Sequence, residues 1–335
     1  MSSLMLLVIF IVFLALVFDF LNGFHDAANS IATVVSTRVL KPHWAVLWAA
    51  FFNFIAFLFF ETKVADTIGK GLINPEIVDP IFILATLSGA IIWNIMTWYY
   101  GLPSSSSHAL IGGLLGTAIV KMGGFSSIQV VALSKTLIAI IISPLTGFVL
   151  GTILMFVTIH LFFRFTRQKT DLLFRKLQLF SAALISLGHG GNDAQKTMGI
   201  IAVLLFSAGM LEGDQFHVPF WVVLSCYFVI ALGTLCGGWR IVRTMGSKIT
   251  KLKPVNGFCA ETAAAVTLFT ASSMGIPVSS THTITGAIVG VGSAQKSTSI
   301  RWTLARRIVW AWIITIPAAA AVSGATWWLI HFFTK

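Results

Sequence analysis

Two short polar runs, each following apolar chain, carry the side chains that could do chemistry. Residues 22–30 read NGFHDAANS and residues 190–196 read GGNDAQK, so Asp26 and Asp193 occupy matching places. An ionised carboxylate at membrane depth is costly unless it has partners, and such residues usually mark functional sites. A solvated aspartate at a helix end is the simpler alternative for either run alone. The repetition favours a site.

A second pair of runs is rich in serine and also repeats. Residues 101–108 read GLPSSSSH and residues 275–282 read GIPVSSTH. The register continues into matched glycines, which are Gly112 with Gly286 and Gly116 with Gly290. Two unrelated motifs in the same order and at nearly the same spacing indicate an internal duplication.

The serine-rich turns precede short apolar segments that we expect to be helices. A helix N-terminus presents free N–H groups and the positive end of the dipole, so it attracts anions. Two such ends meeting near the membrane midplane would form a cradle for an oxyanion. Helix capping is the alternative role for these hydroxyls, but the pairing with two intramembrane aspartates favours binding. The predicted oxyanion-binding residues are Ser105, Ser106, Ser107, Ser279, Ser280, Thr281, Asp26 and Asp193.

Hard oxygen ligands for a cation lie in the same two polar runs. Carboxylate and amide oxygens suit Na⁺, Mg²⁺ or a shuttled proton. The predicted coupling-ion residues are Asp26, Asn29, Asn192, Asp193 and Glu261, of which the two aspartates are also candidate metal ligands. Glu261 is included because it lies within the apolar residues 255–274. The predicted auxiliary residues are Asn22, His25, Asn53, His108, Gln195, Lys196 and His282.

Composition places the chain among membrane proteins. Of its 335 residues, 57% are hydrophobic and 10% are charged, which is typical of a polytopic all-α membrane protein. The net charge of +11 comes from short loops between apolar segments, so it indicates cytoplasmic loops rather than nucleic-acid binding. The lipid bilayer is therefore an expected partner, and nucleic acid is not.

The apolar segments number five in each half. They are 4–37 (broken at 22–30), 44–60, 81–100, 108–121, 129–163, 180–210 (broken at 188–196), 219–239, 255–274, 282–294 and 305–330. Segments 108–121 and 282–294 are shorter than the roughly 30 Å hydrocarbon core requires. Short pieces at matching positions of two halves point to broken or re-entrant helices around a binding site.

The basic loops predict the orientation of the chain. Residues 164–179, 240–254 and 296–307, which include Lys296, are rich in Lys and Arg and are expected in the cytoplasm. Loops 211–218 and 275–281 contain neither and are expected outside, as are the charge-balanced loop 61–80 and both termini. Because five segments is an odd number, the halves are inverted. The predicted division is 1–163, a basic cytoplasmic linker at 164–179, and 180–335.

These four motifs make the chain similar to the inorganic phosphate transporter (PiT) family. Its signature is a Gly-Xaa-Asn-Asp-Xaa-Ala-Asn run in each half, followed by a Gly-Leu-Pro-Xaa-Ser-Ser-Ser-His type run; here residues 23–29 and 190–196 resemble the first and 101–108 and 275–282 the second. The resemblance covers nearly the whole chain, and the run NGFHD at residues 22–26 is similar to that of the family's bacterial low-affinity permeases. It implies a multi-pass symporter of the cytoplasmic membrane that takes up phosphate with a cation.

Two residues depart from the family signature. His25 stands in place of the first signature's Asn, and Lys196 in place of the second signature's last Asn. A lysine has no acceptor and repels Na⁺ if it points inward, although it can pair with Asp193 or with phosphate. The departure favours proton coupling or uptake of a neutral metal–phosphate complex, unless Lys196 extends its ammonium towards solvent. No cofactor is expected, and the coupling cation is H⁺ or Na⁺.

Other functions remain as alternatives. Sulfate would also suit the serine cradle, but a protonated phosphate can donate to a carboxylate whereas sulfate cannot. A passive channel explains the carboxylates less well. An intramembrane aspartyl or serine protease is a remote alternative, because the duplication favours alternating access over hydrolysis and no Gly-Xaa-Ser-Xaa-Gly turn is present. The chain is therefore not expected to be an enzyme, and its sequence is compatible with a homodimer.

Overall fold

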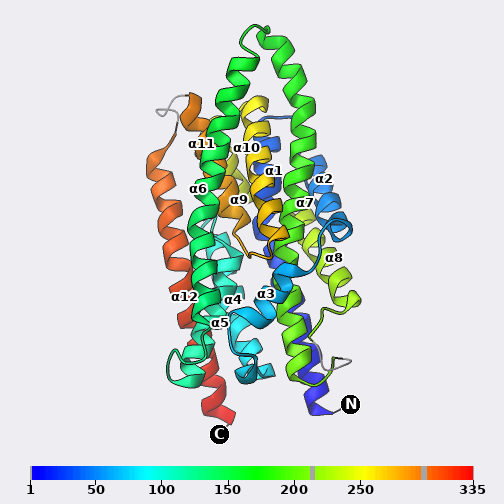
Figure 1. Cartoon of the computed structure of the whole chain (residues 1–335), viewed down its shortest axis with the longest axis vertical. Helices are drawn as coiled ribbons and strands as arrows, with labels where there is room; N and C mark the ends of the chain where they lie inside the picture. The colour runs from blue at the N-terminus through cyan, green and yellow to red at the C-terminus, as the bar shows by residue number, and fades with distance from the viewer. Residues whose placement is uncertain (1, 212–215, 296–299, 335) are drawn as a thin grey trace.

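The computed structural model describes residues 2–211, 216–295 and 300–334, and the regular elements within them are all helices (Figure 1). The α-helices are α1 (Ser3–Ser36), α2 (Pro42–Ile55), α3 (Lys63–Gly71), α4 (Pro80–Tyr99), α5 (Ser106–Met122), α6 (Val130–Leu161), α7 (Arg167–Ser207), α8 (Phe220–Cys236), α9 (Trp239–Arg243), α10 (Pro254–Ser273), α11 (Ser280–Gln295) and α12 (Trp302–Thr334). Short 3₁₀ turns, η1 (Ala56–Leu58) and η2 (Pro75–Ile77), and a π-helical turn, η3 (Thr244–Lys248), complete the chain. The predicted all-α fold is confirmed.

The order of elements repeats, and the second copy runs the other way. Each half consists of a long helix (α1, α7), a bent pair (α2–α3, α8–α9), a helical hairpin (α4–α5, α10–α11) and a long helix with an internal proline (α6, α12). In Figure 1, α1 and α6 run from the lower end of the view to the upper end, whereas α7 and α12 run downwards. The predicted inverted repeat is therefore confirmed.

The helical hairpins bring the serine-rich turns into the middle of the molecule. Lys121, in the last turn of α5, forms an ion pair with Asp79, the N-cap of α4. Both ends of this hairpin therefore lie on one side, and its tip carries the serines. Helices α5 and α11 have 17 and 16 residues, about 25 Å, which is too short to cross a membrane alone. The short segments predicted at 108–121 and 282–294 are confirmed.

The two halves interlock rather than form separate domains. Helix α5 packs along α12 and its counterpart α11 packs along α6, while α1 packs on α8 and α7 on α2. The close approach requires glycine: a Cβ on Gly116 would lie 2.0 Å from the carbonyl oxygen of Ala320, and one on Gly290 2.2 Å from that of Phe148. The predicted division at residues 163 and 180 separates the two copies of the repeat. As a boundary between domains it stays a prediction.

The breaks predicted at 22–30 and 188–196 are wrong. Helices α1 and α7 run through both stretches without interruption. Neither stretch contains proline, and their polar side chains bond to neighbouring helices, so the backbone keeps its helical hydrogen bonds. The bends lie elsewhere: 83° between Pro42–Leu58 and Lys63–Gly69, and 61° between Phe220–Cys236 and Trp239–Lys248. Broken helices exist, but in the bent pairs.

Several expected loops are helical or buried. Residues 61–80 contain α3 and residues 240–254 contain α9 and η3; α3 packs against α7, and α9 and η3 pack against α1. The linker 164–179 is mostly the first turns of α7. Residues 275–281, which the topology count treated as an outside loop, form the tip of the second hairpin, where Val278 and Ser279 are buried.

Basic residues from several segments lie together at one end of the molecule. Arg175 donates to the carbonyl oxygen of Arg38 at 2.6 Å, and Arg167 and Lys253 line one cavity. Both termini lie at the opposite end (Figure 1). Which end faces the cytoplasm stays a prediction. Lys296 and residues 212–215 of the 211–218 loop lie outside the described residues.

Within the described residues, four single helices are long and apolar enough to span a membrane, and the two bent pairs would bring the number to six. These four are α1, α4, α6 and α12. The sequence predicted ten apolar segments, and each contains a helix. The six possible spans leave out four helices, because these are short or carry the polar residues described next. The four are α5, α7, α10 and α11.

Candidate functional site

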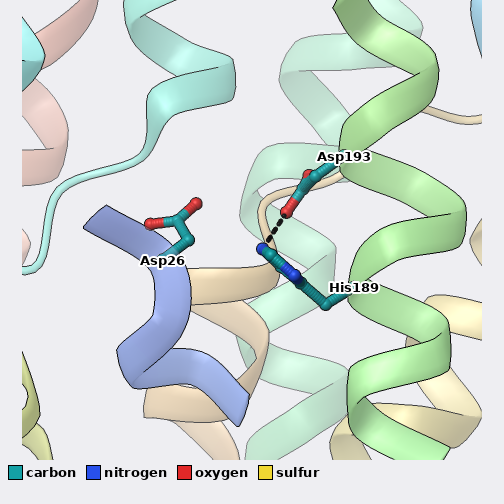
Figure 2. A group of neighbouring side chains, drawn as sticks. All are labelled: Asp26, His189 and Asp193. Carbon is teal, nitrogen blue, oxygen red and sulfur yellow. Dashed lines mark ion pairs between the residues drawn. The ribbon is translucent and has the colours of Figure 1, made fainter. Parts of the chain in front are cut away.

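Two carboxylates from opposite halves meet in the middle of the bundle. Asp26 on α1 faces Asp193 on α7, with His189 of α7 beside them (Figure 2). The three residues are buried, and one ligand atom of each lies within 4.8 Å of the others. The structure thus brings together the two aspartates that the sequence singled out, in an arrangement that could hold a metal ion.

Asp26 lies next to two hydroxyls and a histidine ring. The Oγ atoms of Ser106 and Thr281 donate to its two carboxylate oxygens at 3.0 and 3.1 Å, and Nδ1 of His25 lies 2.9 Å from Oδ1. Ser106 also lies 2.6 Å from the amide oxygen of Asn22. Hydroxyls from both hairpins therefore reach the same carboxylate.

Asp193 has a charged partner as well as neutral ones. Ser280 donates to its Oδ2 at 2.5 Å, and Nε2 of His189 lies 3.1 Å from the same oxygen. The ammonium of Lys196 forms an ion pair with Oδ1 and also donates to Oγ of Ser107 at 2.5 Å. Lys196 therefore points into the site rather than towards solvent.

The contacts follow the inverted repeat. Ser106 bonds to Asp26 as its counterpart Ser280 bonds to Asp193. One turn after each aspartate, Asn29 donates to Thr281 at 3.0 Å, and Lys196 donates to the matching Ser107. Asn29 also donates to Ser280 at 3.1 Å. The duplication thus builds two half-sites with matching contacts, in which Lys196 stands where the first half has Asn29.

The two serine-rich turns both cap their helices and reach the carboxylates. Ser105 and Ser279 accept from the backbone N–H of His108 and His282, each at 3.2 Å, as N-caps do. The alternative role that the sequence offered is therefore correct for these two residues. The next two positions of each turn instead point towards α1 and α7.

Three other predicted residues support the site from outside. Asn192 donates to Ser272 at 3.0 Å and accepts from the backbone N–H of Val278, which holds the tip of the second hairpin. The side-chain oxygen of Gln195 accepts from the first N–H groups of α3. The side-chain oxygen of Asn53 lies 3.2 Å from Nδ1 of His189, and this contact orients the ring.

Glu261 belongs to a different cluster. It accepts from Thr33 at 2.5 Å, Gln178 at 2.9 Å and Ser181 at 2.5 Å, and none of these contacts involves Asp26 or Asp193. Its burial is compensated by these three neutral donors. The prediction that it joins the aspartates in one ion site finds no support in these contacts.

The paired histidines after the serine turns contact each other. The rings of His108 and His282 meet edge to face at 4.2 Å, and His282 stacks on Trp312 at 3.8 Å. Together they line an apolar cavity between α6 and α12. This placement suits the auxiliary role predicted for both histidines, since their rings pack behind the serine turns.

The sequence reading missed His189, Thr33, Gln178 and Ser181. His189 had a signal: it lies one turn before Asp193, as Asn22 lies one turn before Asp26, so an alignment begun at Asn22 would have found it. The polar partners of Glu261 had none, because a single Gln, Ser or Thr in an apolar helix is common.

The site can present hydroxyl donors from two opposed helix N-termini to an anion, between two carboxylates and an ammonium. Many secondary transporters have a buried polar site between inverted repeats, with helix ends aimed at it. The profile of the Phosphate transporter family matches residues 22–323, and the chain belongs to this family. It is therefore a multi-pass membrane protein of a transporter family, not an enzyme.

Individual relatives agree with this membership. The chain is 64% identical to the "Probable low-affinity inorganic phosphate transporter" of Rhizobium meliloti over 95% of both chains. It is 43% identical to the protein of the same name from Bacillus subtilis over 99% of both. A solved structure, "The sodium-dependent phosphate transporter", has the same fold, with a TM-score of 0.86 and 23% identity over 97% of this chain and 99% of that one.

Proposed function

We propose that the protein carries inorganic phosphate across the cytoplasmic membrane together with a cation, by alternating access. One observation carries the proposal: Ser106 and Ser280, at the tips of two opposed hairpins, each donate to a buried aspartate. An oxyanion entering between the hairpins can replace these carboxylates as the acceptor. The names of the Rhizobium meliloti and Bacillus subtilis relatives support phosphate as that oxyanion.

The carboxylates favour phosphate over sulfate. At neutral pH phosphate keeps a proton that it can donate, whereas sulfate has none. Asp26 and Asp193 lie within reach of any anion bound at the serine tips, because both already accept from them. A protonated phosphate can satisfy hydroxyl donors and carboxylate acceptors at once, whereas sulfate has no hydrogen to offset its repulsion from the carboxylates.

The inverted hairpins suggest how access alternates. The α4–α5 hairpin enters from the end that holds the termini, and α10–α11 enters from the basic end. Movement of one hairpin tip away from the aspartates opens the site to one side, while the other tip stays closed. The coupling cation adds positive charge beside Asp26, which has only neutral donors and His25 around it.

A metal–phosphate complex is a second candidate cargo. The cluster of Asp26, His189 and Asp193 offers two hard oxygens and one imidazole nitrogen within 4.8 Å. A divalent metal held there would lie next to the hydroxyls of both hairpin tips. The metal would then travel with the phosphate as cargo.

Uptake of radiolabelled phosphate into proteoliposomes tests the proposal. Proton and Na⁺ gradients are imposed one at a time, with sulfate as a competitor and with a chelator in a further arm. We expect uptake that a cation gradient drives and that excess sulfate barely inhibits. Inhibition by the chelator would select the metal–phosphate complex, and no phosphate uptake under any gradient would contradict the proposed function.

Serine variants test the site in the same assay. Ser106→Ala and Ser280→Ala each remove a hydrogen bond to a charged group, worth about 1.5–3 kcal/mol, so the phosphate KM should rise roughly tenfold to a hundredfold. Ser134→Ala is the matched control, because this exposed serine bonds only to the carbonyl oxygen of Val131. If the variants change the cation dependence and leave the phosphate KM unaltered, the hydroxyls serve the cation instead.

A further inference from the structure

Lys196 is the one Lys or Arg in the two half-sites, and its counterpart in the first half is Asn29. Its side chain is buried, with 2% exposed, one turn after Asp193 on α7. Its ammonium contacts three oxygens: the Asp193 carboxylate, Oγ of Ser107 and, at 2.7 Å, the backbone carbonyl of Val278. These are the oxygen types that coordinate hard cations in proteins.

The ammonium has no hydrogen left for an anion. A lysine carries three N–H donors and no acceptor, and each of the three contacts uses one donor. The contacts come from α7 and from both hairpin tips, so the charge joins all three elements. Lys196 therefore serves here as an internal counter-cation rather than as a phosphate ligand.

The matching place in the first half has an amide and a vacant acceptor. Asn29 uses its Nδ2 to donate to Ser280 and Thr281, and its buried Oδ1 has no hydrogen-bond partner. Asp26 lies one turn earlier and has no Lys or Arg partner among the described residues. A buried unpaired oxygen beside such a carboxylate is a ligand pair for a cation.

We propose that the ammonium of Lys196 permanently fills the cation position of the second half, so that an exchangeable coupling cation binds only beside Asp26 and Asn29. The inference rests on the proposed symport function and adds its cation specificity. One half-site carries its positive charge on the chain, and the other takes it from solution. Replacing Lys196 by Asn, the residue of the first half, should therefore create a second exchangeable site.

The test compares melting of the purified full-length protein in NaCl and in choline chloride at equal ionic strength. Lys196→Asn should melt lower than wild type in choline chloride, because Asp193 loses its counter-charge. Its Na⁺-dependent rise in Tm should exceed that of wild type by about 3 °C at ten times the Kd. Lys196→Asn with Asp193→Asn should lose this extra rise.

The matched control is Lys63→Asn, since Lys63 also pairs with a carboxylate, that of Glu61, but is exposed. It should show the wild-type response to Na⁺. An equal Na⁺ response in Lys196→Asn and wild type would overturn the proposal. This measurement needs no transport, so it decides the inference even if wild-type protein carries no phosphate and the proposed function fails.

Transport supplies a second, independent readout. In wild type the cation dependence of phosphate uptake should fit a single site, with a Hill coefficient of about 1, and in Lys196→Asn it should rise towards 2. Two cooperative sites in wild type would overturn the proposal without any variant having to fold. A phosphate KM that rises in Lys196→Asn and is not restored by saturating Na⁺ would make Lys196 an anion ligand and also overturn it.

Discussion

At the scale of single residues, the two aspartates are buried alike but compensated differently. Asp193 has the ammonium of Lys196, the hydroxyl of Ser280 and the ring of His189. Asp26 has two hydroxyls and the ring of His25. Removing one member of a buried ion pair leaves the other charge without a partner, which costs more than leaving a neutral partner unpaired. Substitutions at the two positions should therefore differ more in their effect on stability than in their effect on function.

Asp26→Asn and Asp193→Asn should each reduce phosphate uptake at least tenfold while the protein still reaches the membrane. Asp193→Asn should in addition lower stability by about 3–5 kcal/mol, because it leaves Lys196 buried without its carboxylate. Uptake in proteoliposomes and melting of the purified variants measure the two effects. Near-normal uptake by either variant removes that aspartate from the site, and equal melting of the two variants contradicts the assigned difference in compensation.

At the scale of elements, each re-entrant helix is held by the long helix of the other half. The backbone of α5 meets α12 at Gly116, and the backbone of α11 meets α6 at Gly290. Helices in lipid lack a hydrophobic drive to associate, so close backbone packing at small residues is what joins them. We therefore expect each pair to behave as a rigid unit that carries a serine-rich tip.

Gly116→Ala should destabilise the protein, since its Cβ would lie 2.0 Å from a backbone oxygen that cannot rotate away. Overpacking of this kind costs about 1–3 kcal/mol, or several degrees in Tm. Gly124→Ala is the matched control, because a Cβ there meets nothing within 4 Å. Equal melting temperatures for Gly116→Ala and Gly124→Ala would show that the α5–α12 contact is looser than described.

At the scale of the whole molecule, the inverted repeat sorts the charges. The segments rich in Lys and Arg that adjoin α6, α7, α10 and α12 lie at one end, and both termini lie at the other (Figure 1). Because positive residues concentrate on the cytoplasmic side, we predict that the termini face outwards.

Single cysteines test this orientation in a background that lacks exposed Cys236. A membrane-impermeant thiol reagent added to intact cells should label Val130→Cys, at the exposed start of α6, and should label Lys169→Cys, in the first turn of α7, only after the membrane is opened. Labelling of both positions from the same side would contradict the inverted arrangement, and the reverse pattern would contradict only its sidedness.

The sequence by itself determined the class of protein, the duplication and most members of the site. Apolar length, basic loops and matched motifs are local or periodic signals, so they predicted helices for all ten apolar segments. The requirement that a buried carboxylate have partners singled out Asp26 and Asp193 before any partner was known. The serine-rich turns before short helices likewise predicted broken or re-entrant helices.

Only the tertiary structure decided which residues meet. It joined His189 to the two aspartates, separated Glu261 from them, turned Lys196 inwards and kept α1 and α7 unbroken where the sequence predicted breaks. The reason is physical: a residue's own sequence neighbours set its helical preference and the cost of burying it. The donor that offsets that cost comes from a helix far along the chain, and packing alone selects it.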